Sequence, residues 1–559
     1  MKFWNRLTPQ RTVIAGAILA TLAYCQDLPY DFILDDVGLI LMNPRLTDWH
    51  NWKTMFVSSV FPGSGGAIHY RPIYGLWLLL NHQLFGFMFP WWHLSSLLLH
   101  ACITLLVFKL GVKVLREPWA AALGALLFAF HPIHAESVAY VAASTDLLVA
   151  LFSILAILTY FEFRERQRGL WLAISIACGI LAMFSKENAV ILPWMILGSE
   201  WLLSSSKKEG RIGWGGFLWS LPYFVVVFGY LGIRTALFGA NLGPGPGESR
   251  IRALLDAPLI LLVYLKNLFW PVSLSFFYPI GWSSHWTIVK IVAFAVVTGI
   301  ILVLMLKWRT RLELRLLLWW TAILFAVPLS GAATFLKEDW VHDRHMYLVS
   351  VPLCLLIAAV IVDRQISGRT KLAVSSIALS ALLVQLVLQV PRFQSEDSIY
   401  SSALKVSPDS VLAHAFYASA LWTHGNREQA FREFRRGVEL TPESSAAHEA
   451  YALALEQDGR STESLAEYEI ALRLSPGISQ SRAYLLYKVG SLELESGNAT
   501  AGTEHLQEAV AIDPNSLNYH AELARAFKEI GRPIDAAEQA RLEAAVRAHF
   551  LKQHSTRTE

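Results

Sequence analysis

The chain carries few charged side chains for its length. Asp, Glu, Lys and Arg make up 16% of its 559 residues, hydrophobic residues make up 54%, and the mean hydropathy is +0.41. A soluble globular protein carries roughly 25% charged residues. The composition therefore excludes an ordinary soluble enzyme and indicates that much of the chain lies in a lipid bilayer.

Cysteine is also scarce. The four cysteines, Cys25, Cys102, Cys178 and Cys354, lie within or beside apolar segments, and none forms a CxxC pair. This excludes a disulfide framework and a cysteine-based zinc site. No run of basic residues is interleaved with aromatic residues on a polar segment, so we expect no nucleic-acid partner.

Charge is distributed unevenly along the chain. Residues 1–391 hold 30 Lys and Arg against 20 Asp and Glu, whereas residues 392–559 hold 17 against 24. A basic, apolar first part and an acidic, polar second part predict a membrane domain over 1–391 followed by a soluble domain over 392–559.

Eleven apolar stretches approach the ~20 residues that a transmembrane helix needs. Placing the short basic loops in the cytoplasm puts the N-terminus there and everything after residue 391 outside the cell (inner) membrane, on a periplasmic or extracytoplasmic face. We expect the first span to be retained, because Tyr24 is too bulky for a signal-peptide cleavage site. Two interrupted stretches, 72–88 and 257–277, are expected as interfacial or re-entrant segments on the outer side. The expected spans are residues 11–26, 91–112, 118–134, 145–163, 169–185, 188–204, 214–236, 285–306, 313–334, 346–362 and 371–391.

This topology gathers ionisable residues on the outer face, where such groups at membrane depth are candidates for function. The first outer loop, 27–90, carries the adjacent carboxylates Asp35 and Asp36 among apolar neighbours. The other candidates come from the end of that loop and from three later loops. They are Arg71, His131, His134, Glu136, Asp146, Lys186, Glu187, Arg344 and Tyr347.

Several of these residues have plainer interpretations. The Asp pair could cap a helix, Lys186 and Glu187 could pair with each other, and Arg344 could anchor the outer loops. His131 and His134, three residues apart, could hold a metal, although Pro132 between them favours an ordinary turn. His93 and His100 share one helical face and are expected to bond between helices.

Residues 392–559 contain a repeat. Pro408, Pro442 and Pro476 are 34 residues apart, and Gly425, Gly459, Gly497 and Gly531 run in step with them. This period is typical of tetratricopeptide repeats, which are stacked helical hairpins. We expect a partial repeat at 395–409 and full repeats at 411–444, 445–478, 483–516 and 517–550. Such an array binds peptides or proteins in its groove and does no chemistry itself.

Six motifs occur in an order that resembles the transmembrane-and-tetratricopeptide O-mannosyltransferases, the TMTC family. They read FILDDVGLI, HYRPIYGLWLLLNHQLFG, WWHLSSLLLH, HPIHAESVAYV, FSKEN and DRHMYL. The resemblance implies an all-α fold, with a polytopic GT-C membrane domain of about 11 spans followed by a tetratricopeptide α-solenoid. One departure is Ser144 and Thr145 before Asp146, where the family usually has an Arg.

The resemblance also implies an activity. A family member moves a mannose-like sugar from a polyprenyl-phosphate donor to a protein Ser or Thr, or to another envelope acceptor, on the outer face. Asp35 and Asp36 would be catalytic, with a carboxylate taking the proton of the attacking hydroxyl. Arg344, then Arg71 and Lys186, would bind the phosphate. The lipid-linked sugar is a substrate, and no metal ligands are assigned.

The alternative function is a non-catalytic membrane-anchored repeat scaffold for envelope protein assembly. A transporter would carry charges in mid-span and internal repeat symmetry. The sequence shows neither feature in the membrane domain.

Overall fold

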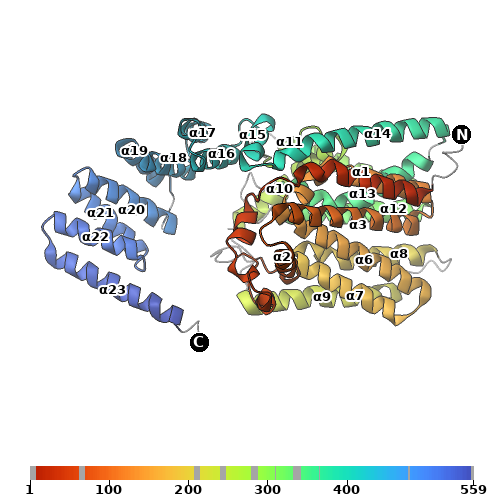
Figure 1. The fold of residues 1–559 in the computed structure, drawn as a ribbon, viewed down its shortest axis with the longest axis horizontal. Coiled ribbons are helices and arrows are strands. Elements are labelled where there is room, and N and C mark those ends of the chain that lie inside the picture. Colours follow the sequence, from red (N-terminus) through yellow and green to blue (C-terminus); the bar gives the residue numbers. More distant parts are fainter. Residues whose placement is uncertain are drawn as a thin grey trace. The chain divides into compact units, whose positions relative to one another are not determined.

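The computed structural model describes residues 8–61, 69–206, 214–239, 247–278, 287–308, 310–331, 341–363, 365–475, 477 and 479–555. Within those ranges the chain forms helices and turns and no β-strand, which confirms the expected all-α class (Figure 1). The chain divides into two compact units, residues 1–407 and 408–559.

Each of the eleven expected spans coincides with a helix. These are α1 (Pro9–Tyr24), α3 (Phe89–Leu115), α4 (Pro118–Ala129), α6 (Ser144–Arg166), α7 (Gly169–Ser185), α8 (Leu192–Ser206), α9 (Trp214–Phe238), α11 (Thr287–Lys307), α12 (Leu312–Gly331), α13 (Met346–Asp363) and α14 (Gly368–Gln389). In the described ranges, six helices are long and apolar enough to cross a membrane, and a seventh results if α4 and the segment after it, bent by 49°, form one span. The number eleven stays a prediction. The basic loop at 207–211 and residues 337–340 lie outside the described residues.

The two interrupted stretches are helical over part of their length. α2 (Pro72–Phe85) has 14 residues, fewer than the ~20 that cross a bilayer. α10 (Gly247–Phe269) contains Pro258, and the chain leaves the helix at Trp270. Neither appears among the helices of the described residues that are long and apolar enough to span, and their place at the membrane stays a prediction.

Proline and small residues shape the bundle. α2, α3 and α4 each have a proline in the first helical turn, where its missing N–H costs nothing. Gly111 of α3 and Gly124 of α4 lie where an added Cβ would come within 2.6–2.7 Å of the Leu355 side chain on α13. Glycine thus lets these three helices pack closely, as helices in lipid commonly do.

Short elements at the ends of these helices carry most of the candidate residues. They are η2 (Cys25–Asp27), η3 (Val37–Leu41), η4 (Pro44–Leu46), η5 (Trp49–Phe56), η6 (Pro132–His134), α5 (Ala135–Ala139), η7 (Val141–Ala143), η8 (Glu187–Ile191), η10 (Asp343–His345) and η11 (Val390–Phe393).

The second unit consists of four helical hairpins, which Figure 1 shows as successive stacked pairs. The pairs are α16 (Val411–Thr423) with α17 (Arg427–Leu440), α18 (Ser445–Gln457) with α19 (Ser461–Leu474), α20 (Gln480–Glu495) with α21 (Ala499–Ile512), and α22 (Leu517–Glu529) with α23 (Pro533–Ser555). The four phased glycines all have φ between +73° and +87°, the left-handed region that ends a helix readily only with glycine. Pro476 lies outside the described residues.

The boundary between the units differs from the expected one at 391. The expected partial repeat forms α15 (Glu396–Val406), which belongs to the first unit. α15 buries Ile399, Tyr400 and Ala403, and the Tyr400 ring stacks on Phe277 at 6.2 Å between centroids. These contacts attach α15 to the membrane unit, although its sequence reads as half a repeat.

Candidate functional site

The adjacent carboxylates Asp35 and Asp36 have opposite environments. Asp35 is exposed, whereas Asp36 is 1% exposed. The Asp36 carboxylate caps no helix: its Oδ2 accepts the Ile33 N–H at 3.2 Å and its Oδ1 accepts the Ala142 N–H at 2.7 Å. The capping interpretation is therefore wrong for Asp36, which instead ties the first outer loop to the α5–α6 connection.

Burial changes the proton affinity of this carboxyl. Burial raises the pKa of Asp36 well above its ordinary value, the two backbone N–H groups oppose that rise, and the charge of Asp35 adds to it. The Asp35 side chain faces outward from the same turn. The loop therefore presents one accessible carboxylate beside one buried carboxyl.

Tyr140 connects the Asp pair with the cationic part of the site. Its hydroxyl accepts the Asp35 N–H at 3.0 Å. Burial, and then the charges of Asp35 and Asp36, raise the pKa of Tyr140, whereas Arg344 opposes this. Both carboxyl groups and Arg344 are thus within electrostatic range of one phenol.

Arg344, in η10 directly before α13, is paired. Its guanidinium Nη1 lies 2.6 Å from Glu136 Oε1, and its backbone N–H donates to Glu136 Oε2 at 3.1 Å. Glu136 is buried, while the Arg344 side chain keeps 21% of its surface accessible. A buried carboxylate therefore holds a partly exposed guanidinium within electrostatic range of Tyr140.

Lys186 and Glu187 do not pair with each other, so that alternative is wrong. Lys186 Nζ lies 2.7 and 2.8 Å from the two Asp146 oxygens, and both residues are buried. Glu187 forms a two-bond pair with Arg71, at 3.0 and 2.6 Å. Adjacent residues in the chain thus bind different helices, which fixes the connection between α7 and α8.

The three cations form one group. Burial lowers the pKa of Lys186; Asp146 opposes that shift, and the positive charges of Arg71 and Arg344 add to it. Arg71, Lys186 and Arg344 come from three separate segments, and each has its own carboxylate partner. The structure thus brings together six of the candidates: the three cations and Glu187, Asp146 and Glu136.

The side chains of His131, His134 and Tyr347 are buried between the helices of the membrane unit. His131 Nε2 bonds the Leu268 carbonyl at 2.9 Å, and His134 Nε2 lies 2.8 Å from Ser350 Oγ. The Tyr347 hydroxyl lies 2.7 Å from His100 Nδ1, and the Tyr347 ring packs 4.7 Å from that of His134. The structure does not bring these three side chains to the Asp pair, and their assignment to substrate binding stays a prediction.

Two expectations about histidines can be compared with the structure. His93 bonds the Tyr30 carbonyl, and His100 bonds Tyr347 and the Ala129 carbonyl, which confirms contacts between segments. Among the residues that the structure describes, no group of three or more His, Cys, Asp or Glu side chains could hold a metal ion. His131 and His134 each have a hydrogen-bond partner through Nε2.

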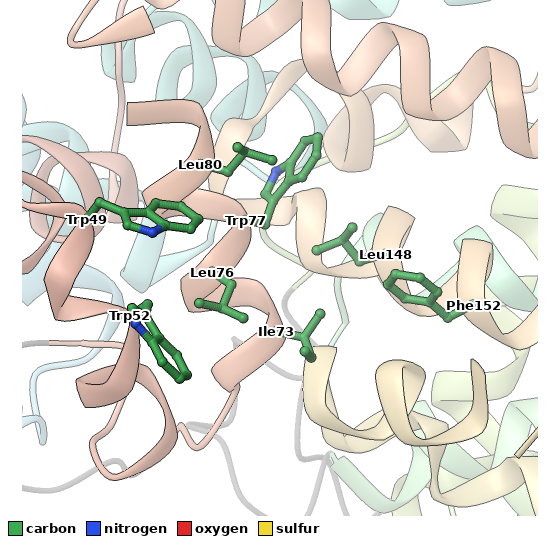
Figure 2. Close-up of a pocket in the computed structure, with 8 residues that line it drawn as sticks. All are labelled: Trp49, Trp52, Ile73, Leu76, Trp77, Leu80, Leu148 and Phe152. Atoms are coloured by element: carbon green, nitrogen blue, oxygen red, sulfur yellow. The ribbon is translucent and has the colours of Figure 1, made fainter. Parts of the chain in front are cut away.

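An apolar pocket of about 420 Å³ lies between η5, α2 and α6. Figure 2 shows Trp49 and Trp52 of η5 on one side, Leu148 and Phe152 of α6 on the other, and side chains of α2 between them. The α2 residues in the lining are Ile73, Leu76, Trp77 and Leu80. Leu148 follows Asp146 by half a turn of α6, so this pocket adjoins the segment that carries the buried pair.

Sequence reasoning missed two groups at the site. Tyr140 lies inside one of the quoted motifs, so its position was a usable signal. Glu396, whose carboxylate accepts the Leu34 N–H, lies in a segment that reads as a repeat helix and gave no signal. Asp343, next to Arg344, accepts bonds from Asn267 and from Tyr278, which come from the chain around the end of α10.

The arrangement suits transfer of a group between an anionic carrier and a hydroxyl. A carboxylate within reach of a hydroxyl takes its proton as it attacks. Guanidinium and ammonium groups stabilise a departing phosphate. The apolar pocket can accept a hydrocarbon chain, because eight apolar and aromatic side chains line it.

Comparisons with known proteins place this arrangement in context. The family described as "Dolichyl-phosphate-mannose-protein mannosyltransferase" matches residues 70–230, a range that includes Arg71, Glu136, Asp146, Lys186 and Glu187. The mouse protein O-mannosyl-transferase TMTC4 is 24% identical over 500 residues, which are 78% of this chain and 66% of the relative. Human TMTC1 is 26% identical over 488 residues, 77% of this chain and 54% of the relative.

A solved structure is similar to part of the chain. YrrB, described as a tetratricopeptide-repeat protein with an unusual peptide-binding site, shares 14% identity over 34% of this chain and 98% of its own, with a TM-score of 0.25. The chain spans 66% or less of the length of the TMTC relatives above. The family match, the relatives and the order of the motifs all make the chain similar to the TMTC proteins.

Proposed function

We propose that the chain transfers a mannose-like sugar from a polyprenyl-phosphate donor to the hydroxyl of a protein Ser or Thr, or to another envelope acceptor, on the outer face of the cell membrane. The observation that carries this proposal is the exposed Asp35, whose backbone N–H donates to Tyr140. That phenol also lies within electrostatic range of the Arg344 guanidinium, which a buried Glu136 holds in place. The names of the TMTC relatives support the sugar and the protein acceptor.

Asp35 acts as the general base. The acceptor hydroxyl loses its proton as it attacks the anomeric carbon, and Asp35 is the accessible carboxylate of the pair. Positive charge develops on the sugar in the transition state, and a nearby carboxylate stabilises it. Asp36 is buried on two backbone N–H groups and positions Asp35.

Arg344 receives the departing phosphate first, with Arg71 and Lys186 behind it. Each cation is paired with a carboxylate before the donor arrives, which holds its side chain in one geometry. A guanidinium carries five N–H donors in a planar fork, so Arg344 can contact a phosphate while bonded to Glu136.

The prenyl chain of the donor lies in the pocket between η5, α2 and α6. That pocket is apolar, and Trp49 and Trp52 at its edge are 48% and 41% exposed. Tryptophan is enriched where a membrane meets water. A lipid chain entering there would bring its phosphate toward the outer ends of α6 and α7.

The repeats select the protein acceptor. Their helical hairpins carry packing residues, and stacked repeats expose a continuous surface for a peptide. We place the N-terminus in the cytoplasm and the repeats on the periplasmic or extracytoplasmic side, because short basic loops remain in the cytoplasm.

The test incubates the purified full chain with radiolabelled polyprenyl-phosphate mannose and a Ser/Thr-rich acceptor peptide. We expect label on the peptide with the parent chain and not with Asp35→Asn; an arm with EDTA measures any metal requirement. A parent chain that transfers no sugar from any polyprenyl-phosphate donor, but still binds envelope proteins through its repeats, would favour the scaffold function.

A further inference from the structure

The turn that carries the Asp pair has an unfavourable backbone conformation. Leu34, the residue directly before Asp35, has φ +53°. This left-handed region suits glycine, because a Cβ crowds the neighbouring carbonyl. A residue with a side chain stays there only when its surroundings hold it.

Side-chain acceptors hold three consecutive N–H groups of this turn. The Ile33 N–H donates to Asp36 within the turn, at 3.2 Å. The Leu34 N–H donates to Glu396 Oε1 at 3.2 Å, and the Asp35 N–H donates to Tyr140 Oη at 3.0 Å. The last two acceptors come from segments 362 and 105 residues away in the chain.

Glu396 is itself held firmly. It is the first residue of α15, where Ser395 caps the helix by accepting the Ser398 N–H. Ile399, Tyr400 and Ala403, on the same face of α15 as Glu396, are buried. A carboxylate at the first turn of a capped, packed helix has little freedom to move.

The two distant acceptors are joined by aromatic contacts. The Tyr140 ring packs 6.5 Å from Phe276, Phe276 packs 5.1 Å from Phe277, and Phe277 stacks on Tyr400 at 6.2 Å, all between centroids. This chain of rings runs from the Asp35 anchor to the helix that carries the Leu34 anchor. A shift of α15 would therefore reach both anchors of the turn.

We propose that Glu396, on the helix that joins the membrane unit to the repeats, is a positioning residue for the Asp35–Asp36 turn. The carboxylate fixes the left-handed conformation of Leu34 and so aims the Asp35 carboxylate. The sequence that begins the first full repeat, at Val411, follows α15 directly, so the helix that leads into the repeats is also part of the active site. This role rests on the proposed function.

Three substitutions at this position separate a positioning role from a charge effect. Glu396→Gln keeps an oxygen that can accept the Leu34 N–H, whereas Glu396→Ala removes it. Glu396→Asp keeps the charge but withdraws the carboxylate by one methylene. A misplaced reacting group costs up to about 100-fold in rate. We therefore expect kcat to fall about 10- to 100-fold in Glu396→Ala and Glu396→Asp, with the KM for the donor unchanged, and to recover within about threefold in Glu396→Gln.

A control variant in the repeats and a hydrogen-exchange measurement distinguish the role of Glu396 from the proposed transferase function. Glu428→Ala removes an exposed carboxylate from the first full repeat and should leave kcat unchanged. Hydrogen exchange of the amides at residues 33–36 in the full chain should quicken in Glu396→Ala and Glu396→Asp but not in Glu396→Gln or Glu428→Ala. A parent chain without transferase activity would defeat the proposed function, while the exchange data would still decide the role of Glu396. Unchanged exchange in both Glu396→Ala and Glu396→Asp would overturn the inference.

Discussion

The two units of the chain use ion pairs in different ways. In the membrane unit, Lys186 and Asp146 pair across segments and are 8% and 7% exposed at their side chains. In the repeats, Arg432 and Glu428 pair one turn apart on the same helix and are 63% and 90% exposed. Sequence spacing predicts the exposed pairs within one helix, but it does not predict the buried pairs between segments.

This difference indicates what each set of charges does. Removing two charges from water costs several kcal/mol per ion, and an apolar pair of similar size would often be as stable. Stability alone therefore explains the buried pairs of the membrane unit poorly, and the influence of Arg71 and Arg344 on Lys186 agrees with the anion binding proposed above. Exposed pairs within a helix add a few tenths of a kcal/mol and keep the surface soluble.

The repeats contain one buried charge pattern of their own. In the first hairpin His414 Nδ1 lies 2.6 Å from Glu433, and its Nε2 lies 3.0 Å from the Pro408 carbonyl. Both partners accept, so a neutral imidazole, which has one N–H, cannot donate to both. In the last hairpin the carboxylate is replaced by Gln539, 2.7 Å from His520 Nδ1, and an amide can serve as donor or acceptor.

The largest effect should follow from Asp35→Asn. Loss of a general base typically lowers the rate by ~10²–10⁴. The exposed carboxylate has no structural bond to lose, so the unfolding temperature should not change. Transfer from labelled donor, with a thermal melt in detergent, measures both. The control is Asp31→Asn, an exposed carboxylate in the same loop, which should transfer at the parent rate. Equal rates in both variants would remove Asp35 from the mechanism.

Breaking the buried pair should have the next largest effect. Lys186→Met leaves Asp146 buried and uncompensated, and such losses cost about 3–5 kcal/mol of unfolding free energy. The double variant Lys186→Met with Asp146→Leu should regain most of that stability and still fail to bind donor. Denaturant unfolding in detergent and a donor-binding assay measure the two properties. Lys109→Met, at an exposed position of α3, is the control. A double variant that binds donor like the parent would show that the pair is only structural.

A smaller, pH-dependent effect is expected at His414. Burial alone would lower the pKa of His414, but Glu433 and the Pro408 carbonyl outweigh it and raise the pKa above 6.5, with Arg436 opposing. The stabilisation is therefore fully present below about pH 6.5 and is lost as the pH rises through the raised value. Glu433→Gln should remove that dependence and cost about 1–2 kcal/mol at pH 6.

Unfolding of the repeat unit within the full chain, followed between pH 6 and pH 9, measures this dependence. The Gln539-containing hairpin supplies the control, since Gln539→Glu should add a dependence of the same sign. A parent chain whose repeats are equally stable at both ends of this range would show that His414 carries no extra proton.

The smallest effect should come from Glu428→Gln, which removes the exposed pair with Arg432. Exposed pairs contribute little, because water and salt screen them. The melting temperature and the transfer rate should both stay at the parent values. A clear loss of stability would show that surface pairs in the repeats matter more than their exposure suggests.

The helices and the repeats could be predicted from the sequence alone. Both are local or periodic properties: an apolar stretch must satisfy its backbone as a helix in lipid, and a 34-residue period with turn glycines specifies hairpins that stack on their neighbours. The helices therefore fall on the expected spans, and the glycine turns fall where the period places them. The apolar setting of the Asp pair also marked it as a functional candidate.

The partner of each buried charged group, in contrast, depends on how the helices pack. Lys186 binds Asp146 and not its neighbour Glu187, because the end of α7 packs beside the start of α6. Asp36 is buried because the α5–α6 connection supplies the Ala142 N–H to its carboxylate. Asp35 stays exposed because the same connection bonds only its backbone N–H, through the Tyr140 hydroxyl. Glu396 reaches Leu34 across 362 residues because α15 packs on the membrane unit. Partners so far apart in the chain show no characteristic sequence spacing, so the pattern of residues does not predict their contact.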